Sequence, residues 1–261
     1  MAADHLCFGD AVYLLFDDDD IGGCAQAQGF GEDNRLAIYK SQVHGSSFSK
    51  RSVYTVWQQQ TFTHAVALRK EHEENRGGST TRRSEVQRME KLRSLAAKEE
   101  KRNQDAFEMI KGHEVRYGMM IMLRHEGSGR FMAVSTQSSE FDRDARIVTL
   151  SEEVGDEMTF CVMPQFGLLH SEGELIHYSD PVSLNSVSNM GLKLHVSRPR
   201  SEQQNSFEVL AATESSGFKL LCYRGVKAER AAATRVNAPL LFGGMPIRLM
   251  HVEANGYLQA R

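Results

Sequence analysis

The chain has 261 residues, of which 41% are hydrophobic and 25% are charged, and its formal net charge is −3 at pH 7. This composition supports one substantial core with an appendage, and it disfavours a surface that follows nucleic-acid phosphates. No apolar run approaches the roughly 18 residues of a membrane span, and residues 1–5 carry neither the basic nor the apolar part of a signal peptide.

The first predicted element is a β-hairpin near the start of the chain. Residues 9–14 are predicted to form a strand, and the aspartates and glycines from Asp17 to Gly23 are typical of a turn. The aspartate run at 17–20 has the charge to attract calcium, but Ile21 stands where a calcium loop needs an oxygen ligand. We therefore interpret this segment as a solvated hairpin tip and predict no metal site.

A helical arm is predicted to follow a strand at residues 53–56, which the only tryptophan, Trp57, closes as a core residue. From about Thr63 to Lys111 the chain becomes rich in Ala, Glu, Lys and Arg with helical spacing, and residues 75–79 interrupt it. Ser84 and Gln87 fit a capping box near the start of the longer helix. We expect a helix-turn-helix excursion from a β-domain, with a charged face that is either solvated or a partner-binding surface.

Internal repetition is the strongest signal in the remaining chain. Residues 118–125 return as residues 244–251, and each copy runs through a glycine-containing turn into an aromatic-led segment. A looser copy spans 180–196, with a turn at 189–191. His125 and His251 occupy equivalent positions, which indicates a packing role for both and not catalysis.

Three hairpin-led repeats before a fourth begins predict a mainly β fold, a β-trefoil. The trefoil is expected to occupy residues 1–224, with the arm at about 63–111 and its last strand at 218–223. Residues 225–243 are expected to be a linker. Residues 244–261 are expected to be the first hairpin of a second, truncated trefoil, because one hairpin alone is only marginally stable.

Motifs that would carry catalysis or cofactor binding are absent from the sequence. There is no phosphate loop, nucleophile elbow, paired-histidine metal motif or dinucleotide fingerprint, so we expect no enzyme, no cofactor and no metal. The cysteines at 7, 24, 161 and 222 have no metal-type spacing and are interpreted as reduced cytosolic thiols.

The order of hairpin, arm and linker resembles the N-terminal cytosolic domain of the inositol 1,4,5-trisphosphate receptor and ryanodine receptor superfamily, whose hairpins are called MIR motifs. The resemblance is carried by the segments 8–10, 29–36, 100–103, 117–118, 123–125, 130–132, 146–150 and 160–164. It implies a suppressor-type regulatory domain of a calcium-release channel, which lowers inositol trisphosphate affinity and relays gating. The alternatives are a ryanodine-receptor-type gating domain and a stand-alone MIR trefoil that binds carbohydrate or protein.

The resemblance also implies where such a domain acts. It would lie on the cytosolic face of the endoplasmic reticulum, without inserting in the membrane and without nucleic acid. Its partners would be the ligand-binding core of the same polypeptide, neighbouring subunits of a tetramer and regulators on the arm. The ligand-gripping residues are expected beyond Arg261.

Two loops are the candidate coupling surfaces that this resemblance implies. The first is the 29–35 loop and the second is the 164–170 loop, where Gly167 stands in place of the family's aromatic residue. The interdomain residues predicted on them are Phe30, Asp33, Arg35, Phe166, Leu168, Leu169 and His170.

Overall fold

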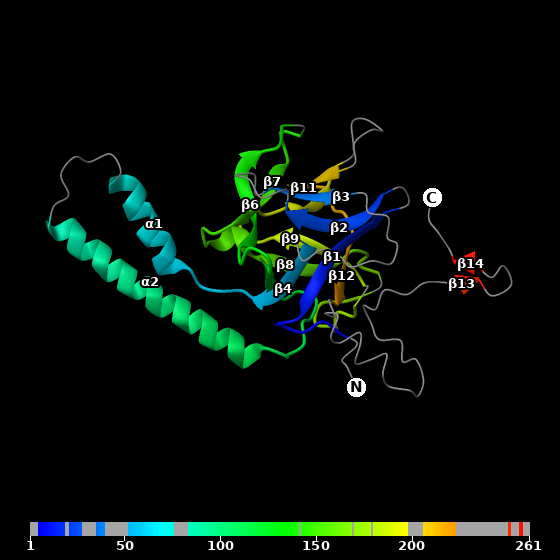
Figure 1. The fold of residues 1–261 in the computed structure, drawn as a ribbon, viewed down its shortest axis with the longest axis horizontal. Helices are drawn as coiled ribbons and strands as arrows, with labels where there is room; N and C mark the ends of the chain where they lie inside the picture. The colour runs from blue at the N-terminus through cyan, green and yellow to red at the C-terminus, as the bar shows by residue number, and fades with distance from the viewer. Residues whose placement is uncertain are drawn as a thin grey trace.

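A computed structural model describes residues 5–18, 21–27, 35–39, 52–75, 83–140, 142–168, 170–178, 180–197, 206–222, 250–251 and 256–257. Twelve strands form one sheet, beside which two helices project as an arm (Figure 1). The strands, in chain order, are β1 (Ala11–Asp18), β2 (Ile21–Ala27), β3 (Leu36–Tyr39), β4 (Val53–Gln58), β5 (Met120–His125), β6 (Phe131–Ser138), β7 (Arg146–Ser151), β8 (Phe160–Pro164), β9 (Pro181–Ser186), β10 (Lys193–Val196), β11 (Ser206–Ala212) and β12 (Phe218–Cys222).

The strand pairings confirm the predicted β-trefoil. Strands β1, β4, β5, β8, β9 and β12 pair in that cyclic order, and β12 pairs back with β1 to close a barrel. The remaining strands form three hairpins, β2–β3, β6–β7 and β10–β11, of which the second and third pair through β11 and β7 and the first joins them through β3. Each third of the chain thus contributes four strands, and barrel closure leaves no free edge there.

A triangle of backbone hydrogen bonds joins the three repeats and marks their pseudo-threefold symmetry. The N–H of Leu6 donates to the carbonyl of Ile176 at 2.8 Å, that of Val115 donates to Leu6 at 2.8 Å, and that of Ile176 donates to Val115 at 3.3 Å. All three residues are fully buried in the main core cluster. The three segments that carry them, residues 5–10, 114–119 and 175–180, are called the first, second and third basal segments below.

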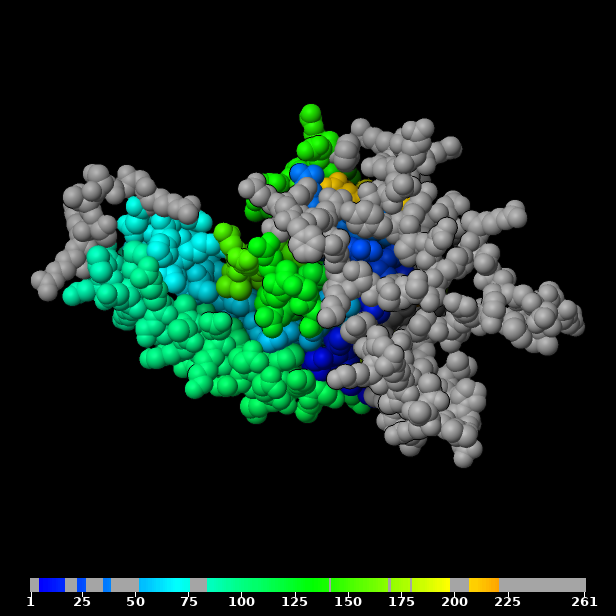
Figure 2. All heavy atoms as spheres, viewed as in Figure 1, coloured from blue at the N-terminus to red at the C-terminus, as the bar shows by residue number. Residues whose placement is uncertain are grey.

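The arm confirms the predicted helical insertion. Helix α1 spans Thr63–Asn75 and α2 spans Arg83–Ile110. They lie side by side as an elongated projection from the barrel (Figure 2). Because α2 begins at Arg83, Ser84 lies inside its first turn, and the expected capping box does not precede the helix.

The arm is anchored at its root by an aromatic cluster separate from the barrel core. Trp57 on β4 and Phe107 on α2 are both buried, together with Phe62, Met122 and Met158. The core role predicted for Trp57 is therefore confirmed, and its main partner comes from the arm. Arg69 of α1 adds ion pairs to Glu153 at 3.2 Å and to Glu157 at 3.8 Å.

Three further sequence predictions are tested by the strand bounds. The first turn is shorter than expected, since β1 continues to Asp18 and β2 begins at Ile21, so the predicted turn residues Asp17 and Gly22 face each other in the ladder. The predicted last strand is confirmed as β12. A short hairpin, β13 (Met250–His251) with β14 (Gly256–Tyr257), also forms where the fourth repeat was predicted, while the predicted linker at 225–243 lies outside the described residues.

Candidate functional site

The 164–170 loop presents two apolar side chains to solvent. It follows β8, and its Leu168 is fully exposed while Phe166 is 57% exposed. Large apolar side chains exposed together on one short loop are typical of an interaction surface. Gly167 between them has open space around the position of a Cβ atom, and Leu169 lies outside the described residues.

The ends of this loop are held firmly, so its tip is a projection with a fixed base. The N–H of Gln165 donates to the carbonyl of Pro181 at 3.0 Å, and the Gln165 side chain accepts from Ser215 at 3.1 Å. At the other end the His170 ring stacks on Tyr117 with centroids 5.3 Å apart, and its Nδ1 lies 3.2 Å from Glu174. His170, predicted as an interface residue, therefore packs on the base of the loop, whereas Phe166 and Leu168 point outward.

Arg35 is the one described member of the other predicted surface, since Phe30 and Asp33 lie outside the described residues. Its guanidinium lies 3.6 Å from Glu208 and 3.9 Å from Glu140, and its backbone forms an isolated bridge with Thr149. About a third of the Arg35 side chain stays exposed. Arg35 is therefore oriented by residues of the β6–β7 and β10–β11 hairpins and keeps a face toward solvent.

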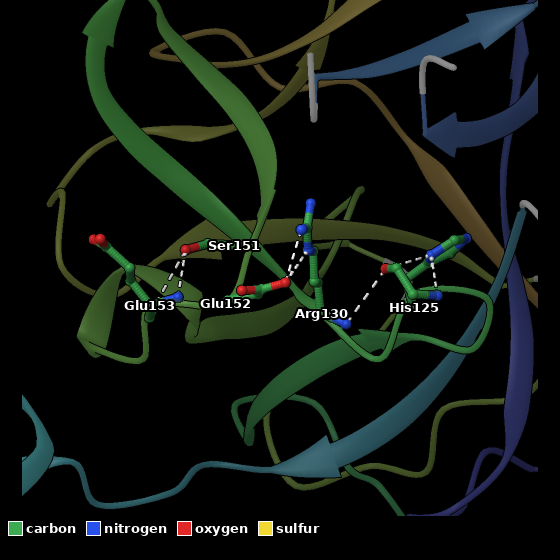
Figure 3. A network of polar contacts seen from close by, with 6 residues as sticks. His125, Arg130, Ser151, Glu152 and Glu153 are labelled. Carbon is green, nitrogen blue, oxygen red and sulfur yellow. Dashed lines mark hydrogen bonds and ion pairs between the residues drawn. The ribbon is translucent and has the colours of Figure 1, made fainter. Parts of the chain in front are cut away.

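A shallow groove of about 560 Å³ lies beside Arg35, and its lining includes residues that were not predicted from the sequence. Arg130 lies in the same groove and donates from Nε and Nη2 to one carboxylate oxygen of Glu152, at 2.9 and 2.7 Å (Figure 3). Next to this pair Ser151 Oγ bonds the backbone of Glu153. The groove is lined by Arg35, Arg130, Ser135, Gln137, Ile147, Thr149, Leu150, Ser151, Glu152 and Glu153.

Arg130 owes its position to the hairpin turn that precedes it. The N–H of His125 donates to the Arg130 carbonyl at 2.8 Å, and the buried His125 ring accepts from the Ser128 N–H while packing on Tyr54. This confirms the packing role predicted for His125. The sequence offered one usable signal for Arg130, its place directly after a glycine turn at the start of a strand.

The described residues hold no cluster suited to metal binding, and the described thiols are poor nucleophiles. No group of three or more His, Cys, Asp or Glu side chains lies close enough together to hold a metal ion in the described part of the chain. Burial raises the pKa of the Cys7, Cys24 and Cys161 thiols, so each favours its protonated form. Neither described helix is long and apolar enough to cross a membrane.

The family comparison agrees with the sequence resemblance and with the geometry. Residues 2–229 match the family model described as inositol 1,4,5-trisphosphate/ryanodine receptor. This match covers the whole trefoil, the arm and both candidate loops. Since most of the chain is matched, the protein belongs to the inositol 1,4,5-trisphosphate/ryanodine receptor family, as an N-terminal β-trefoil domain.

Proposed function

We propose that this chain is a suppressor-type regulatory module of a ligand-gated calcium-release channel, which lowers the inositol 1,4,5-trisphosphate affinity of a ligand core and relays gating to a neighbouring subunit. Family membership supports a regulatory domain in such a channel. The observation that carries the relay role is the outward projection of Phe166 and Leu168 from a loop whose base is fixed.

Physically, the relay requires a contact that differs between two channel states. Such a coupling is worth typically about 1–3 kcal/mol, or roughly 5–150-fold in affinity. Apolar side chains that are exposed in one state and covered in the other can supply it, because burying one large side chain is worth about 1.5–3 kcal/mol. Because the base of the loop is fixed to the barrel, a movement of the barrel also moves the exposed side chains at the loop tip and so reaches the neighbouring subunit.

The Arg35 surface is proposed as the contact with the ligand core. Arg35 and Arg130 line one groove, and each lies beside glutamate partners. Positive and negative side chains therefore alternate along that surface. A partner with the complementary pattern would be oriented there, and electrostatic complementarity fixes register more than it adds affinity. Phe30 and Asp33 of the same predicted surface would extend it.

The relay is tested in a longer protein that contains the ligand core and the membrane region. Leu168→Ser should reduce ligand-evoked calcium flux, because the proposed contact with the neighbouring subunit is lost, and since coupling is reciprocal it should also change inositol trisphosphate affinity by up to the same roughly 5–150-fold range. Met190→Ser is the matched control, since Met190 is 95% exposed on a different turn. Equal flux in the two variants would contradict the relay role of the loop.

The suppressor role is tested by affinity alone in a protein that adds only the ligand core. Arg35→Ala and Phe30→Ala should each raise inositol trisphosphate affinity, by a factor in the roughly 5–150-fold range that such couplings span. Arg143→Ala, an exposed arginine outside the groove, is the control. Unchanged affinity in both variants would remove the support for suppression through this surface.

A further inference from the structure

The three basal segments contain equivalent turns with equivalent backbone hydrogen bonds. In the first, second and third segments the N–H of Asp10, Met119 and Asp180 donates to the carbonyl of Cys7, Arg116 and His177, at 3.2, 3.1 and 3.1 Å. Phe8, Tyr117 and Tyr178 are therefore equivalent by pseudo-symmetry, and so are Asp10, Met119 and Asp180.

A tyrosine–aspartate hydrogen bond joins neighbouring basal segments at two of the three junctions, whereas the third has a partly exposed side-chain pair, His5 with Glu114 at 3.7 Å. The hydroxyl of Tyr178 donates to Asp10 at 2.6 Å, and the hydroxyl of Tyr117 donates to Asp180 at 3.3 Å. Each aspartate oxygen also accepts the backbone N–H three residues before it, from Cys7 and His177. We call each Tyr–Asp pair a latch, and the junction it spans is latched.

The third junction, between the first and second segments, lacks both members of the latch. Phe8 stands where the others have tyrosine, and Met119 stands where the others have aspartate. The two substitutions are matched, because a tyrosine hydroxyl alone would face a methionine and an aspartate alone would face a phenyl ring. Phe8 and Met119 line one open cavity of about 800 Å³, to which Met120, Ile110, Gln58 and Gln59 also contribute.

Backbone bonding at the unlatched junction is the same as at a latched one, so the side chains are what differ. The N–H of Phe8 donates to His113 at 2.9 Å and that of Gly112 donates to Phe8 at 2.8 Å. At the latched junction the N–H of Tyr117 donates to Glu174 at 3.0 Å and that of Gly173 donates to Tyr117 at 2.9 Å. Gly112 and Gly173 even share a positive φ, of 84° and 87°.

The helical arm straddles the unlatched junction. Its residue Phe107 packs on Trp57 of the first repeat, and the same cluster includes Met122 and Met158 of the second repeat. Arg69 of α1 ion-pairs with Glu153, also of the second repeat. A force on the arm therefore acts on both sides of this junction, and the chain enters and leaves the arm beside the cavity.

We propose that the junction between the first and second repeats is a built-in weak seam of the trefoil, and that the arm is a lever across it. A missing charge-assisted hydrogen bond and an open cavity both lower the free energy needed to separate the two segments. The two latched junctions hold the other repeats together while this one opens. The weaker junction is expected in the isolated chain, without any partner bound to the arm.

Native-state amide hydrogen exchange on residues 1–261 tests the seam with controls inside one molecule. The amides of Phe8 and Gly112 should show protection at least about tenfold lower than those of Tyr117 and Gly173, because only the former pair crosses an unlatched junction. Equal protection of the two pairs would overturn the proposal.

Variants then test whether the latch is the cause. Phe8→Tyr with Met119→Asp should raise protection of Phe8 and Gly112 to the level of Tyr117 and Gly173, and neither single change should do so. Tyr117→Phe, which keeps the ring, should lower protection of Tyr117 and Gly173 to the level of the seam and leave Phe8 unchanged. If the double variant fails to fold, the wild-type comparison and Tyr117→Phe still decide the question. A uniform change at all four amides would overturn the seam, because it would indicate global stability alone.

Discussion

The indole ring of Trp57 on β4 stacks on the phenyl ring of Phe107 on α2, with centroids 3.7 Å apart and planes at 7°. Phe131 meets the same indole edge-on at 5.9 Å, and the Arg124 guanidinium lies 5.4 Å from its centre. An arm residue therefore completes the environment of the only tryptophan, and the root of the arm is part of the folded core.

Phe107→Ala should destabilise the protein by about 3–5 kcal/mol, the usual cost of truncating a buried phenylalanine. Tryptophan fluorescence should also shift to longer wavelength, because Trp57 loses its cover. Met109→Ala on the exposed face of α2 is the control, with a change within about 0.5 kcal/mol. Denaturant unfolding measures both, and equal midpoints would contradict the anchoring role of Phe107.

Glu99→Ala should weaken the arm by about 0.5–2 kcal/mol, the range for loss of a helix N-cap. Glu99 is buried on α2, and its Oε2 accepts the N–H groups of His64 at 3.0 Å and Ala65 at 3.2 Å in the first turn of α1. The change leaves these donors without the acceptor that α2 supplies. Circular dichroism and the unfolding midpoint measure the loss, and Glu100→Ala, an exposed neighbour, should match the wild type.

Two deletions of different extent should separate the root of the arm from its outer part. Replacing residues 68–95 by a short flexible turn should preserve the unfolding transition, because Phe62, Glu99 and Phe107 remain. Deleting residues 63–111 should lower the midpoint, because Trp57 loses its stacking partner. If the shorter deletion unfolds the barrel as fully as the longer one, the outer arm contributes to the core.

Stability should fall as pH rises through the window from about 9 to 12, in part because of Cys24. Burial raises the pKa of the Cys24 thiol from 9.0 to about 12, so above pH 9 the unfolded chain loses a proton that the folded chain keeps. Its contribution is full below pH 9 and declines with a slope of up to about 1.4 kcal/mol per pH unit. Cys24→Ala should show a shallower decline in denaturant unfolding series at pH 8 to 11, and parallel curves would exclude this contribution.

Residues 1–261 alone should bind inositol 1,4,5-trisphosphate negligibly. Binding of a trisphosphate depends on clustered basic side chains, whereas both groove arginines, Arg35 and Arg130, have glutamate partners. Titration calorimetry at low ionic strength should show no saturable heat. Stoichiometric micromolar binding would place the ligand site within this chain.

Two kinds of feature could be predicted from the sequence: segments that repeat, and boundaries at which the composition of the chain changes. The hairpin copies led to the trefoil, and the loss of alternation after residue 62 located the arm almost to the residue, as α1 begins at Thr63. These predictions succeeded because periodicity and composition are local properties of the chain.

Features that depend on contacts between distant segments could not be predicted. Glu99 caps a helix whose first turn precedes it by some 35 residues, and a charged residue in a run of charges gives no sign of this. The groove that joins Arg35 to Arg130 likewise depends on how the three hairpins outside the barrel pair with one another. The turn at Asp17 to Gly23 was predicted too long because glycine and aspartate signal a turn even where the ladder continues through them.

Closure of the barrel by β1 and β12 also governs the order of folding during synthesis. Val12 pairs with Cys222, so one side of β1 has no partner until nearly the whole trefoil has left the ribosome. Pairing of such distant segments is slow, and an open strand edge in the meantime is a site for misassembly. β12 is the last strand of the trefoil to be made, and its pairing with β1 is the step that covers this open edge.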